Sequence, residues 1–405
     1  MDALTTPSNW QRVRLGDIAE IKRGVRITKN ELDVFGKYPV VSGGVGFLGY
    51  TNNFNRYENT ITIAQYGTAG YVNFQKNKFW ANDVCFCIYP NKDIIKNIFL
   101  YYFLKVNQNY LYEISNRNAT PYSISKDKIL DFEIPLPPLN EQIAIANILS
   151  ALDRYLHALD SLILKKESIK KALRIKMLNQ ILASNGVEFR ELGDIILSLK
   201  TGLNPRSFFK LNTPNANNYY VTIRELEDYT IKFTHQTDRI DDNALSLCLK
   251  RSNLEKDDIL FSGTGTIGKV SIIEKNPNNW AIKEGIYSIK PNKKIVFPRF
   301  LMFCLESSNI QNDIKNKSFG GIVKSIPMND LQQIQIPLPP LNEQIAIANI
   351  LSALDNEITS LKNKKRQFEN IKKALNHDLM SAKIRVLKKI NAPKVKDKPA
   401  YKGNP

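Results

Sequence analysis

The glycine-rich run at residues 263–269 is the part of the sequence that comes closest to a nucleotide-binding motif. It matches G-x-G-x-x-G and nearly completes G-x-x-x-x-G-K-[ST], a loop whose backbone N–H groups cradle phosphates. Such glycines must open a helix whose N-terminus meets the phosphate. Here a strand-like sequence follows, and Val270 stands where Ser or Thr would hold Mg²⁺. We therefore expect a β-hairpin that approaches a DNA backbone closely, with nucleotide binding as the alternative.

Other catalytic chemistry finds little support. The three histidines are far apart, no Cys and His residues have metal-ligand spacing, and neither G-x-S-x-G nor an Asn/Asp-Pro-Pro-aromatic run occurs. The acidic pairs at 241–242 and 257–258 are expected to be turns. The four cysteines predict reduced, structural thiols. We expect no catalytic residue, metal or cofactor in this chain.

Charge points to a polyanionic partner. The 405 residues include 57 Lys and Arg against 39 Asp and Glu, a net charge of +18. This balance favours nucleic acid over an acidic membrane surface, with a generally lysine-rich composition as the alternative. No apolar run approaches the ~18 residues of a membrane span. We therefore expect a cytoplasmic, DNA-binding protein of two or more domains.

Basic and polar residues near glycine turns could contact phosphates or base edges. Two basic loops pivot on Gly24 and Gly202, and polar turns lie near residues 117 and 324. For any single side chain the alternative is solvated turn charge, and for Arg224 it is a buried ion pair. The DNA-contacting candidates are Lys22, Arg23, Arg26, Tyr66, Thr68, Arg117, Lys200, Arg206, Arg224, Thr264, Thr266, Lys269 and Lys324.

One stretch of twenty residues occurs twice without a change. Residues 134–153 and 336–355 both have the sequence IPLPPLNEQIAIANILSALD, 202 positions apart (336 − 134). Its prolines keep the residues before them out of the α region, so the first part should be extended. Asn140 then stands where a helix N-cap belongs, and Glu141 falls in the first turn. We call this junction of extended segment and helix the joint.

A long amphipathic helix is predicted after each joint. Apolar residues recur at spacings of three and four from Ile143 to Ile181, and from Ile347 to Leu379. Each helix would have about 40 residues and a length of ~60 Å. Two such helices with near-heptad stripes predict a coiled coil within one chain.

The remainder of the chain is also duplicated. Leu15-Gly-Asp-Ile matches residues 192–195, and a strand, a glycine turn and a returning strand recur in both halves. The interiors of the two halves differ in sequence. The repeat predicts globular segments at 1–138 and 186–340, long helices at 139–185 and 341–383, and a disordered basic tail at 384–405.

The repeated Pro-Leu-Pro-Pro-Leu-x-Glu-Gln run, with the Leu-Gly-Asp openings and the glycine hairpins, resembles the DNA-specificity subunits of type I restriction–modification systems. The resemblance covers nearly the whole chain, although the first hairpin lacks a counterpart of Lys269. It implies an α+β fold. Two mixed α/β target-recognition domains would be joined by two long antiparallel helices, which form an intramolecular coiled coil with pseudo-twofold symmetry.

The resemblance also implies the function. The chain would have no activity of its own and would place methyltransferase subunits, expected to number two, and possibly restriction subunits on a bipartite, asymmetric DNA site. S-adenosylmethionine, ATP and Mg would bind only those partners. The length of the helices would set the number of base pairs between the two half-sites, which the protein does not recognise and which we call the spacer. The joints would dock the partners. The predicted docking residues are Pro138, Asn140, Glu141, Gln142, Pro340, Asn342, Glu343 and Gln344. The remaining alternative is a coiled-coil scaffold without DNA recognition.

Overall fold

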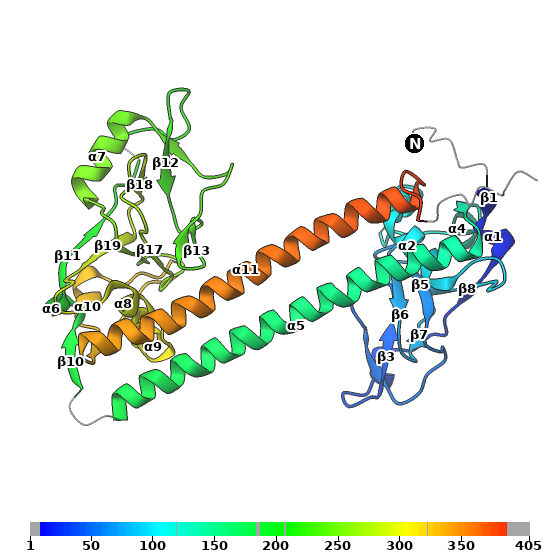
Figure 1. Ribbon diagram of the computed structural model, residues 1–405, viewed down its shortest axis with the longest axis horizontal. Coiled ribbons are helices and arrows are strands. Elements are labelled where there is room, and N and C mark those ends of the chain that lie inside the picture. The colour runs from blue at the N-terminus through cyan, green and yellow to red at the C-terminus, as the bar shows by residue number, and fades with distance from the viewer. Residues whose placement is uncertain (1–8, 119, 184–186, 206–207, 322, 387–405) are drawn as a thin grey trace, which may run out of the picture. The chain divides into compact units, whose positions relative to one another are not determined.

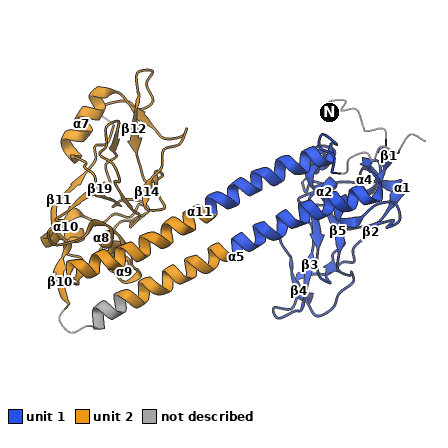
Figure 2. Cartoon of the chain, in the orientation of Figure 1, with its two compact units in different colours: residues 1–161, 362–405 blue, residues 162–361 orange. Residues whose placement is uncertain are grey.

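The computed structural model describes residues 9–118, 120–183, 187–205, 208–321 and 323–386, without the side chains of residues 178–183. The chain forms two compact units (Figure 2). Unit 1 comprises residues 1–161 and 362–405, and unit 2 comprises residues 162–361. Both borders fall inside long helices, so each unit contains one globular part and one portion of each helix. The domain boundaries expected from the repeat follow a different division and stay a prediction.

Unit 1 is built on two small sheets (Figure 1). The four-stranded sheet has the order β2-β8-β5-β6 and is antiparallel throughout. A second sheet has the order β4-β3-β7, in which β3 and β7 are parallel. The strands are β2 (Ala19–Arg23), β3 (Tyr38–Val41), β4 (Gly49–Thr51), β5 (Thr60–Ala64), β6 (Val72–Gln75), β7 (Trp80–Ala81) and β8 (Cys85–Pro90). The helical elements are α1 (Leu15–Ile18), η1 (Lys29–Glu31), α2 (Asn97–Val106), α3 (Gln108–Glu113) and α4 (Lys126–Leu130). The predicted strand, glycine turn and returning strand are confirmed in this unit by β5 and β6, which pair antiparallel.

Unit 2 repeats this topology. Its sheets have the orders β11-β19-β16-β17 and β15-β12-β18, again with one parallel pair in the smaller sheet. The strands are β11 (Ile196–Thr201), β12 (Asn218–Val221), β13 (Leu226–Glu227), β14 (Thr230–Ile231), β15 (Arg239–Ile240), β16 (Ile259–Ser262), β17 (Val270–Ile272), β18 (Trp280–Ile282) and β19 (Ile286–Pro291). The helices are α6 (Leu192–Ile195), α7 (Asp242–Ser252), α8 (Pro298–Leu305), α9 (Ser308–Asn316) and α10 (Met328–Gln332).

The prediction of a turn at residues 241–242 is wrong. Asp241 is the N-cap of α7, and its side chain accepts a hydrogen bond from the backbone N–H of Ala244. A carboxylate at this position satisfies a free helix donor, and Asp is also common in turns. The sequence pattern alone therefore did not separate the two.

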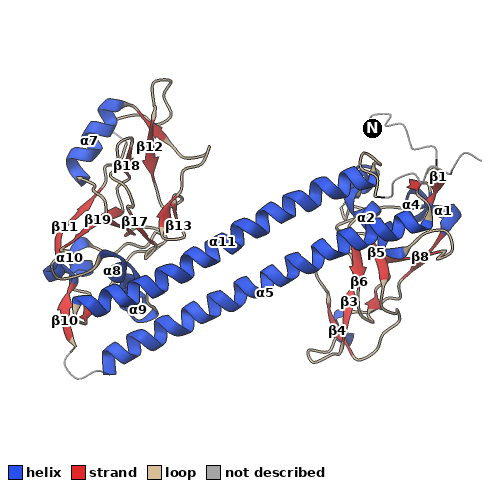
Figure 3. Cartoon of the chain, viewed as in Figure 1, coloured by secondary structure: helices blue, strands red, loops and turns tan. Residues whose placement is uncertain are grey.

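Each joint is a short ladder followed at once by a long helix (Figure 3). β9 (Glu133–Leu136) pairs with β1 (Gln11–Arg14), and β20 (Gln335–Leu338) pairs with β10 (Glu188–Glu191), both antiparallel. The predicted extended segment is thus confirmed. The helices α5 (Leu139–Ala183) and α11 (Leu341–Met380) begin one residue before the expected caps. The carbonyl of Pro138 accepts hydrogen bonds from the N–H groups of Glu141 and Gln142, so Asn140 lies in the first turn and is not the N-cap.

The two long helices run antiparallel in each unit. In unit 1, Asp160 pairs with Lys365 at 2.6 Å, and the rings of Tyr155 and Phe368 lie 4.6 Å apart. In unit 2, Lys166 pairs with Glu357 at 2.8 Å. A lysine also meets the aspartate that ends the duplicated stretch in both units, as Lys372–Asp153 and as Lys170–Asp355. The two lysines are themselves 202 residues apart (372 − 170), so the same pair forms twice with the helices exchanged.

The end of α11 completes the core of unit 1. Leu379 and Met380 are buried in the cluster that contains Ile61, Phe99 and Leu149, and Val386 packs against it. The expectation of a disordered tail from residue 384 is therefore wrong as far as residue 386. The remaining tail residues, and the side chain of Ile181 in the expected apolar stripe, lie outside the described residues. Within the described ranges, no helix has the length and apolarity needed to cross a membrane.

Candidate nucleic-acid interface

The glycine-rich runs are β-hairpins in both units. In unit 2, β16 and β17 flank residues 263–268 and pair antiparallel. Gly265 and Gly268 have φ of 81° and 92°, in the left-handed region where glycine costs least. Because a strand and not a helix follows the glycines, the arrangement required for a phosphate cradle is absent from this described segment. The nucleotide-binding alternative at Gly263–Lys269 is therefore rejected.

The turn before each joint is hydrogen-bonded to the glycine hairpin of the same unit. In unit 1, Gly67 N–H donates to the carbonyl of Tyr122 at 3.1 Å, and Ile124 N–H donates to that of Gln65 at 3.0 Å. In unit 2, the corresponding bonds run from Gly265 N–H to Lys324 at 2.8 Å and from Ile326 N–H to Gly263 at 2.9 Å. The same two bonds therefore join the same two loops in both units. We call the hairpin turn (residues 65–70 in unit 1 and 263–268 in unit 2) and the turn closed by the bridge Asn116–Ser123 or Phe319–Ser325 together the loop pair.

The basic loop of unit 1, which turns at Gly24, is hydrogen-bonded to segments next to the loop pair. Val25 N–H donates to the carbonyl of Ala81, and the buried side chain of Asn82 accepts from Ile27 N–H and donates to Ser42. The neighbouring Gly43 carbonyl accepts from both the N–H and the hydroxyl of Thr68 at 2.9 Å. Four segments that are distant in the sequence are thus held together by backbone and side-chain hydrogen bonds. Such loops on a rigid sheet are a common location for binding residues.

The predicted DNA contacts divide by their surroundings. Thr264, Thr266 and Lys324 are exposed on the loop pair of unit 2. In unit 1, the guanidinium of Arg117 lies over the rings of Tyr112 and Tyr122, at 5.2 and 5.0 Å from their centroids, and Nε donates to the Tyr112 carbonyl. Tyr66 and Thr68 are half-buried. Each unit thus carries part of the predicted contacts on its own loop pair.

Other predicted contacts are engaged elsewhere or lie in strands. Lys22 lies in β2 and pairs with Glu20 at 3.1 Å, and Lys200 lies half-buried in β11, so neither belongs to a turn as expected. Arg224 pairs with Asp238 at 2.7 Å. Lys269 donates to the carbonyls of Ile223 and Leu226. Arg23 donates to the Asp83 carbonyl, Arg26 is exposed, and Arg206 lies outside the described residues.

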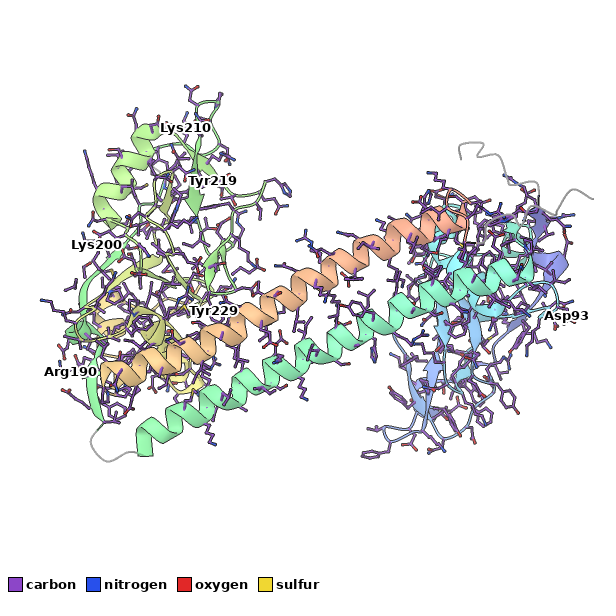
Figure 4. The ribbon with its side chains drawn as sticks, in the orientation of Figure 1. Asp93, Arg190, Lys200, Lys210, Tyr219 and Tyr229 are labelled. Carbon is purple, nitrogen blue, oxygen red and sulfur yellow. The ribbon has the colours of Figure 1, made fainter. Side chains whose placement is uncertain are left out.

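An aromatic stack in unit 2 escaped the sequence analysis. The Tyr219 ring, labelled in Figure 4, stacks on Phe233 with centroids 4.3 Å apart, and Arg239 lies over its other face at 4.3 Å. Trp280 approaches Phe233 from β18. The four residues come from separate strands and loops, so only the three-dimensional pairing of β12 with β15 and β18 could reveal them. Arginine on an aromatic face is a common element of nucleic-acid-binding surfaces.

The joint glutamines are buried and fully bonded. Gln142 accepts from Lys96 N–H at 2.7 Å and donates to the carbonyls of Ile94 and Pro137. Gln344 makes the same three bonds to Phe297, Ile295 and Pro339. Their side chains fasten each long helix to the segment before α2 or α8. This burial removes both glutamines from the predicted docking surface, whereas Pro138, Asn140, Pro340 and Asn342 are exposed.

The joint glutamates, identical in sequence context, differ in environment. Glu141 is only 2% exposed, accepts two hydrogen bonds from Arg385 at 2.7 and 2.9 Å, and accepts one from the indole of Trp10. Glu343 is exposed, and no hydrogen bond or ion pair to its carboxylate is seen among the described residues. Of the two glutamates, only the second therefore lies on the surface, and the docking role stays a prediction.

A polar network ties the globular part of unit 2 to its helix portions. The Tyr229 hydroxyl, also labelled in Figure 4, donates to Glu306, which Arg174 of α5 contacts in turn. Lys170 lies 4.2 Å above the Tyr229 ring and pairs with Asp355 of α11. Burial raises the pKa of Asp355 and of Tyr229 above their ordinary values. The helix portions are thus held to the globular part of unit 2 by oriented polar contacts as well as by the core.

No metal centre is found in the part of the chain that the structure describes. No three His, Cys, Asp or Glu side chains there gather so that they could hold a metal ion. All four cysteines are free and buried, and burial raises the pKa of Cys248 to about 11. A raised thiol pKa lowers the thiolate fraction and hence the reactivity.

The chain matches a protein-family model twice. The model describes the type I restriction modification DNA specificity domain and matches residues 7–167 and 184–370. The chain belongs to this family. Each match spans one globular part and most of the long helix that follows it, as the duplicated joint predicts.

Individual relatives agree with the family model. A protein described as the type I restriction enzyme MjaX specificity subunit of Methanocaldococcus jannaschii is 31% identical over 73% of this chain and 70% of its own length. The MjaVIII specificity subunit of the same organism is 26% identical over 95% of each chain. The crystal structure of the S subunit of a type I restriction–modification system from M. genitalium superposes with a TM-score of 0.66 at 22% identity, covering 93% of this chain and 97% of that one. The predicted family and α+β fold class are confirmed. As a member of the family, the chain is a non-catalytic DNA-specificity subunit, which rejects the coiled-coil scaffold without DNA recognition.

Proposed function

We propose that each unit of this specificity subunit recognises one half of a bipartite DNA target through its loop pair. The observation that carries the proposal is the recurrence of the same two hydrogen bonds between hairpin and turn in units whose exposed loop residues differ. Loops that are held by the same hydrogen bonds but carry different exposed residues suit a pair of recognition modules with different half-sites. The target is then asymmetric.

The chemistry of the exposed tips differs between the units. The unit 2 tip offers the hydroxyls of Thr264 and Thr266, which can donate to or accept from either base type in the major groove. The unit 1 tip offers Arg117, whose guanidinium suits the two acceptors of guanine. The net charge of +18 supplies salt-sensitive backbone affinity that does not depend on sequence.

We infer that the long helices set the distance between the half-sites and carry the partner subunits. On each helix, one exposed stripe follows the joint: Ile143, Ile148 and Ala151 on α5, and Ile345, Ile350 and Ala353 on α11. Two copies of one apolar stripe would suit two copies of one methyltransferase subunit. S-adenosylmethionine, ATP and Mg are assigned to such partners, because methyl transfer and restriction occur outside this chain. We infer that these subunits act on DNA in the cytoplasm.

Footprinting of the subunit bound to its methyltransferase tests the proposal. We expect protection of two short tracts around an unprotected spacer. Arg117→Ala should weaken protection of one tract, and the Thr264→Ala/Thr266→Ala double variant that of the other. Arg190→Ala is the control, because Arg190 is a half-buried arginine paired with Glu188 on the ladder strand β10, away from the loop pair. A single protected tract, or equal loss of both tracts in each variant, would refute the assignment of one half-site to each unit.

A further inference from the structure

The β3–β4 region of unit 1 carries large apolar side chains that no core absorbs. Val34 and Phe35 are 89% and 93% exposed, and Val45, Phe47 and Tyr50 are also exposed. Figure 3 shows β3 and β4 at the end of unit 1 that is remote from its helix portions. Contiguous exposed apolar residues of this kind mark interaction sites.

The segments that carry these side chains are joined to one another, starting at the loop pair, and we call their five exposed apolar residues the ridge. Gly43, which accepts the hydrogen bonds of Thr68, opens the loop that carries Val45 and Phe47. The Phe47 and Tyr50 rings are in edge contact at 6.2 Å. The Tyr50 carbonyl then accepts from Asp33 N–H at 2.8 Å, directly before the Val34–Phe35 turn. The ridge therefore leads from the proposed DNA surface to the exposed tip.

The tip is rigid, although it is exposed. The Asp33 carboxylate accepts from Phe35 N–H at 2.9 Å and from the side chain of Asn52, and the Asp33 carbonyl accepts from Gly36 N–H at 3.0 Å. Gly36 packs so closely on β4 that an added Cβ would lie 2.5 Å from the backbone nitrogen of Thr51. A turn held in this way presents its two apolar side chains with little conformational entropy left to lose on binding.

The charges around the tip favour a polyanion. Arg26, Lys29 and Lys37 lie in the same chain segment as the tip and are exposed, and Lys37 lies over the Tyr38 ring. The two acids of the same segment are engaged: Asp33 in the turn, and Glu31 in the capping bonds of Thr28, which hold the pKa of Glu31 below its usual value. A narrow apolar tip in a segment with exposed cations fits a duplex better than it fits a broad protein interface.

We propose that the Val34–Phe35 turn is a DNA wedge, which inserts between adjacent base pairs beside the half-site contacted by unit 1 and kinks the duplex. The proposal rests on the proposed recognition of DNA by this unit. Apolar side chains inserted in this way unstack one base step, and the bend exposes more of the duplex to the protein. The ridge residues Val45 and Phe47 would then lie along the groove between the wedge and the loop pair.

Fluorescence of 2-aminopurine, placed at successive positions along the target DNA, tests the wedge with the full subunit in complex with its methyltransferase. We expect a rise of fluorescence at one step beside one half-site for the wild type, no rise for Phe35→Ala, and recovery with Phe35→Leu. Phe35→Ala should also bind the target about ten-fold or more weakly, a loss typical of a stacked aromatic group. Phe189→Ala, which removes a half-exposed ring from the β10 ladder, should leave the signal and the affinity unchanged. Because Phe35 is almost fully exposed, its variants should unfold at the wild-type temperature.

The outcomes separate the wedge from the proposed function. Specific binding by the wild type without any fluorescence rise, and with unchanged affinity of Phe35→Ala, overturns the wedge but leaves DNA recognition intact. Loss of methyltransferase binding in Phe35→Ala with an unchanged DNA signal also overturns it, because the ridge would then dock a protein. Absence of specific binding by the wild-type complex overturns both.

Discussion

The contact between the chain's C-terminal segment and the first joint can be tested against a built-in control. Glu141 is buried between Arg385 and Trp10, whereas Glu343, with the same twenty-residue context, is exposed. We expect Arg385→Ala to destabilise unit 1, because it leaves a buried carboxylate with only the indole N–H as a partner. Glu343→Gln should leave the stability of unit 2 nearly unchanged.

The magnitude follows from the burial of the two partners. Removing one member of a buried ion pair costs about 3–5 kcal/mol. The Arg385 side chain is 29% exposed, so water screens part of the interaction and we expect about 2–4 kcal/mol. Glu343→Gln should change the stability by no more than about 0.5 kcal/mol, as is usual for an exposed site.

Hydrogen exchange resolved by peptide measures the loss in each unit separately, which a single unfolding curve of a chain with two compact units would not. Faster exchange of the Arg385→Ala variant should be confined to peptides of residues 9–161 and 362–386. A cycle of Arg385→Ala, Glu141→Gln and the double variant should give a coupling energy of at least about 1 kcal/mol. Additive effects, or equal effects of Arg385→Ala and Glu343→Gln, would refute the assigned contact.

Three further predictions concern two buried polar side chains and the length of the long helices. Burial raises the pKa of Asp258 to about 6 from an ordinary 3.8, so the folded state binds the proton more tightly and stability is lost as pH rises between these values. The free energy of unfolding of Asp258→Asn should therefore exceed that of the wild type by at most about 3 kcal/mol above pH 6 and by nothing below pH 3. A constant difference in urea unfolding across this pH range would contradict the burial effect. Gln344→Ala leaves two buried carbonyls and one N–H unpaired and should cost about 3 kcal/mol, with Glu343→Gln in the same turn as its control; an unchanged melting temperature would show that water replaces the amide. Deleting residues 158–164 and 361–367 together removes seven residues from each antiparallel helix, a length of about 10 Å. This deletion should shorten the spacer between the half-sites by about 3 base pairs. An unchanged spacer in the methylated sites would show that the helices do not set its length.

Local patterns were sufficient to predict the repeated elements. The prolines of the joint predicted an extended segment, and the apolar stripes predicted two long helices, because both are short-range consequences of backbone sterics and periodicity. The strand at residues 60–64 was found because it is β-branched and flanked by a turn. The hairpin interpretation of Gly263–Gly268 also depended only on the residues that follow it.

Long-range contacts could not be predicted. The fate of Glu141 depends on Trp10 and on Arg385, which lie 131 and 244 residues away in the chain. Identical joints therefore predicted identical roles, and the structure assigns different ones. The pairing of hairpin and turn, the stack on Tyr219 and the ridge that ends at Phe35 likewise arise from loops that meet only in the folded chain.

The central claim is that each unit recognises its own half-site through its loop pair. Mapping of methylated sites in genomic DNA, with Arg117→Ala or with Thr264→Ala/Thr266→Ala in place of the wild-type subunit, tests it most directly. We expect each variant to relax the base preference at one half-site while the other half-site and the spacer stay as in the wild type. Methylated motifs that remain unchanged in both variants, or that degrade in both halves at once, would contradict it.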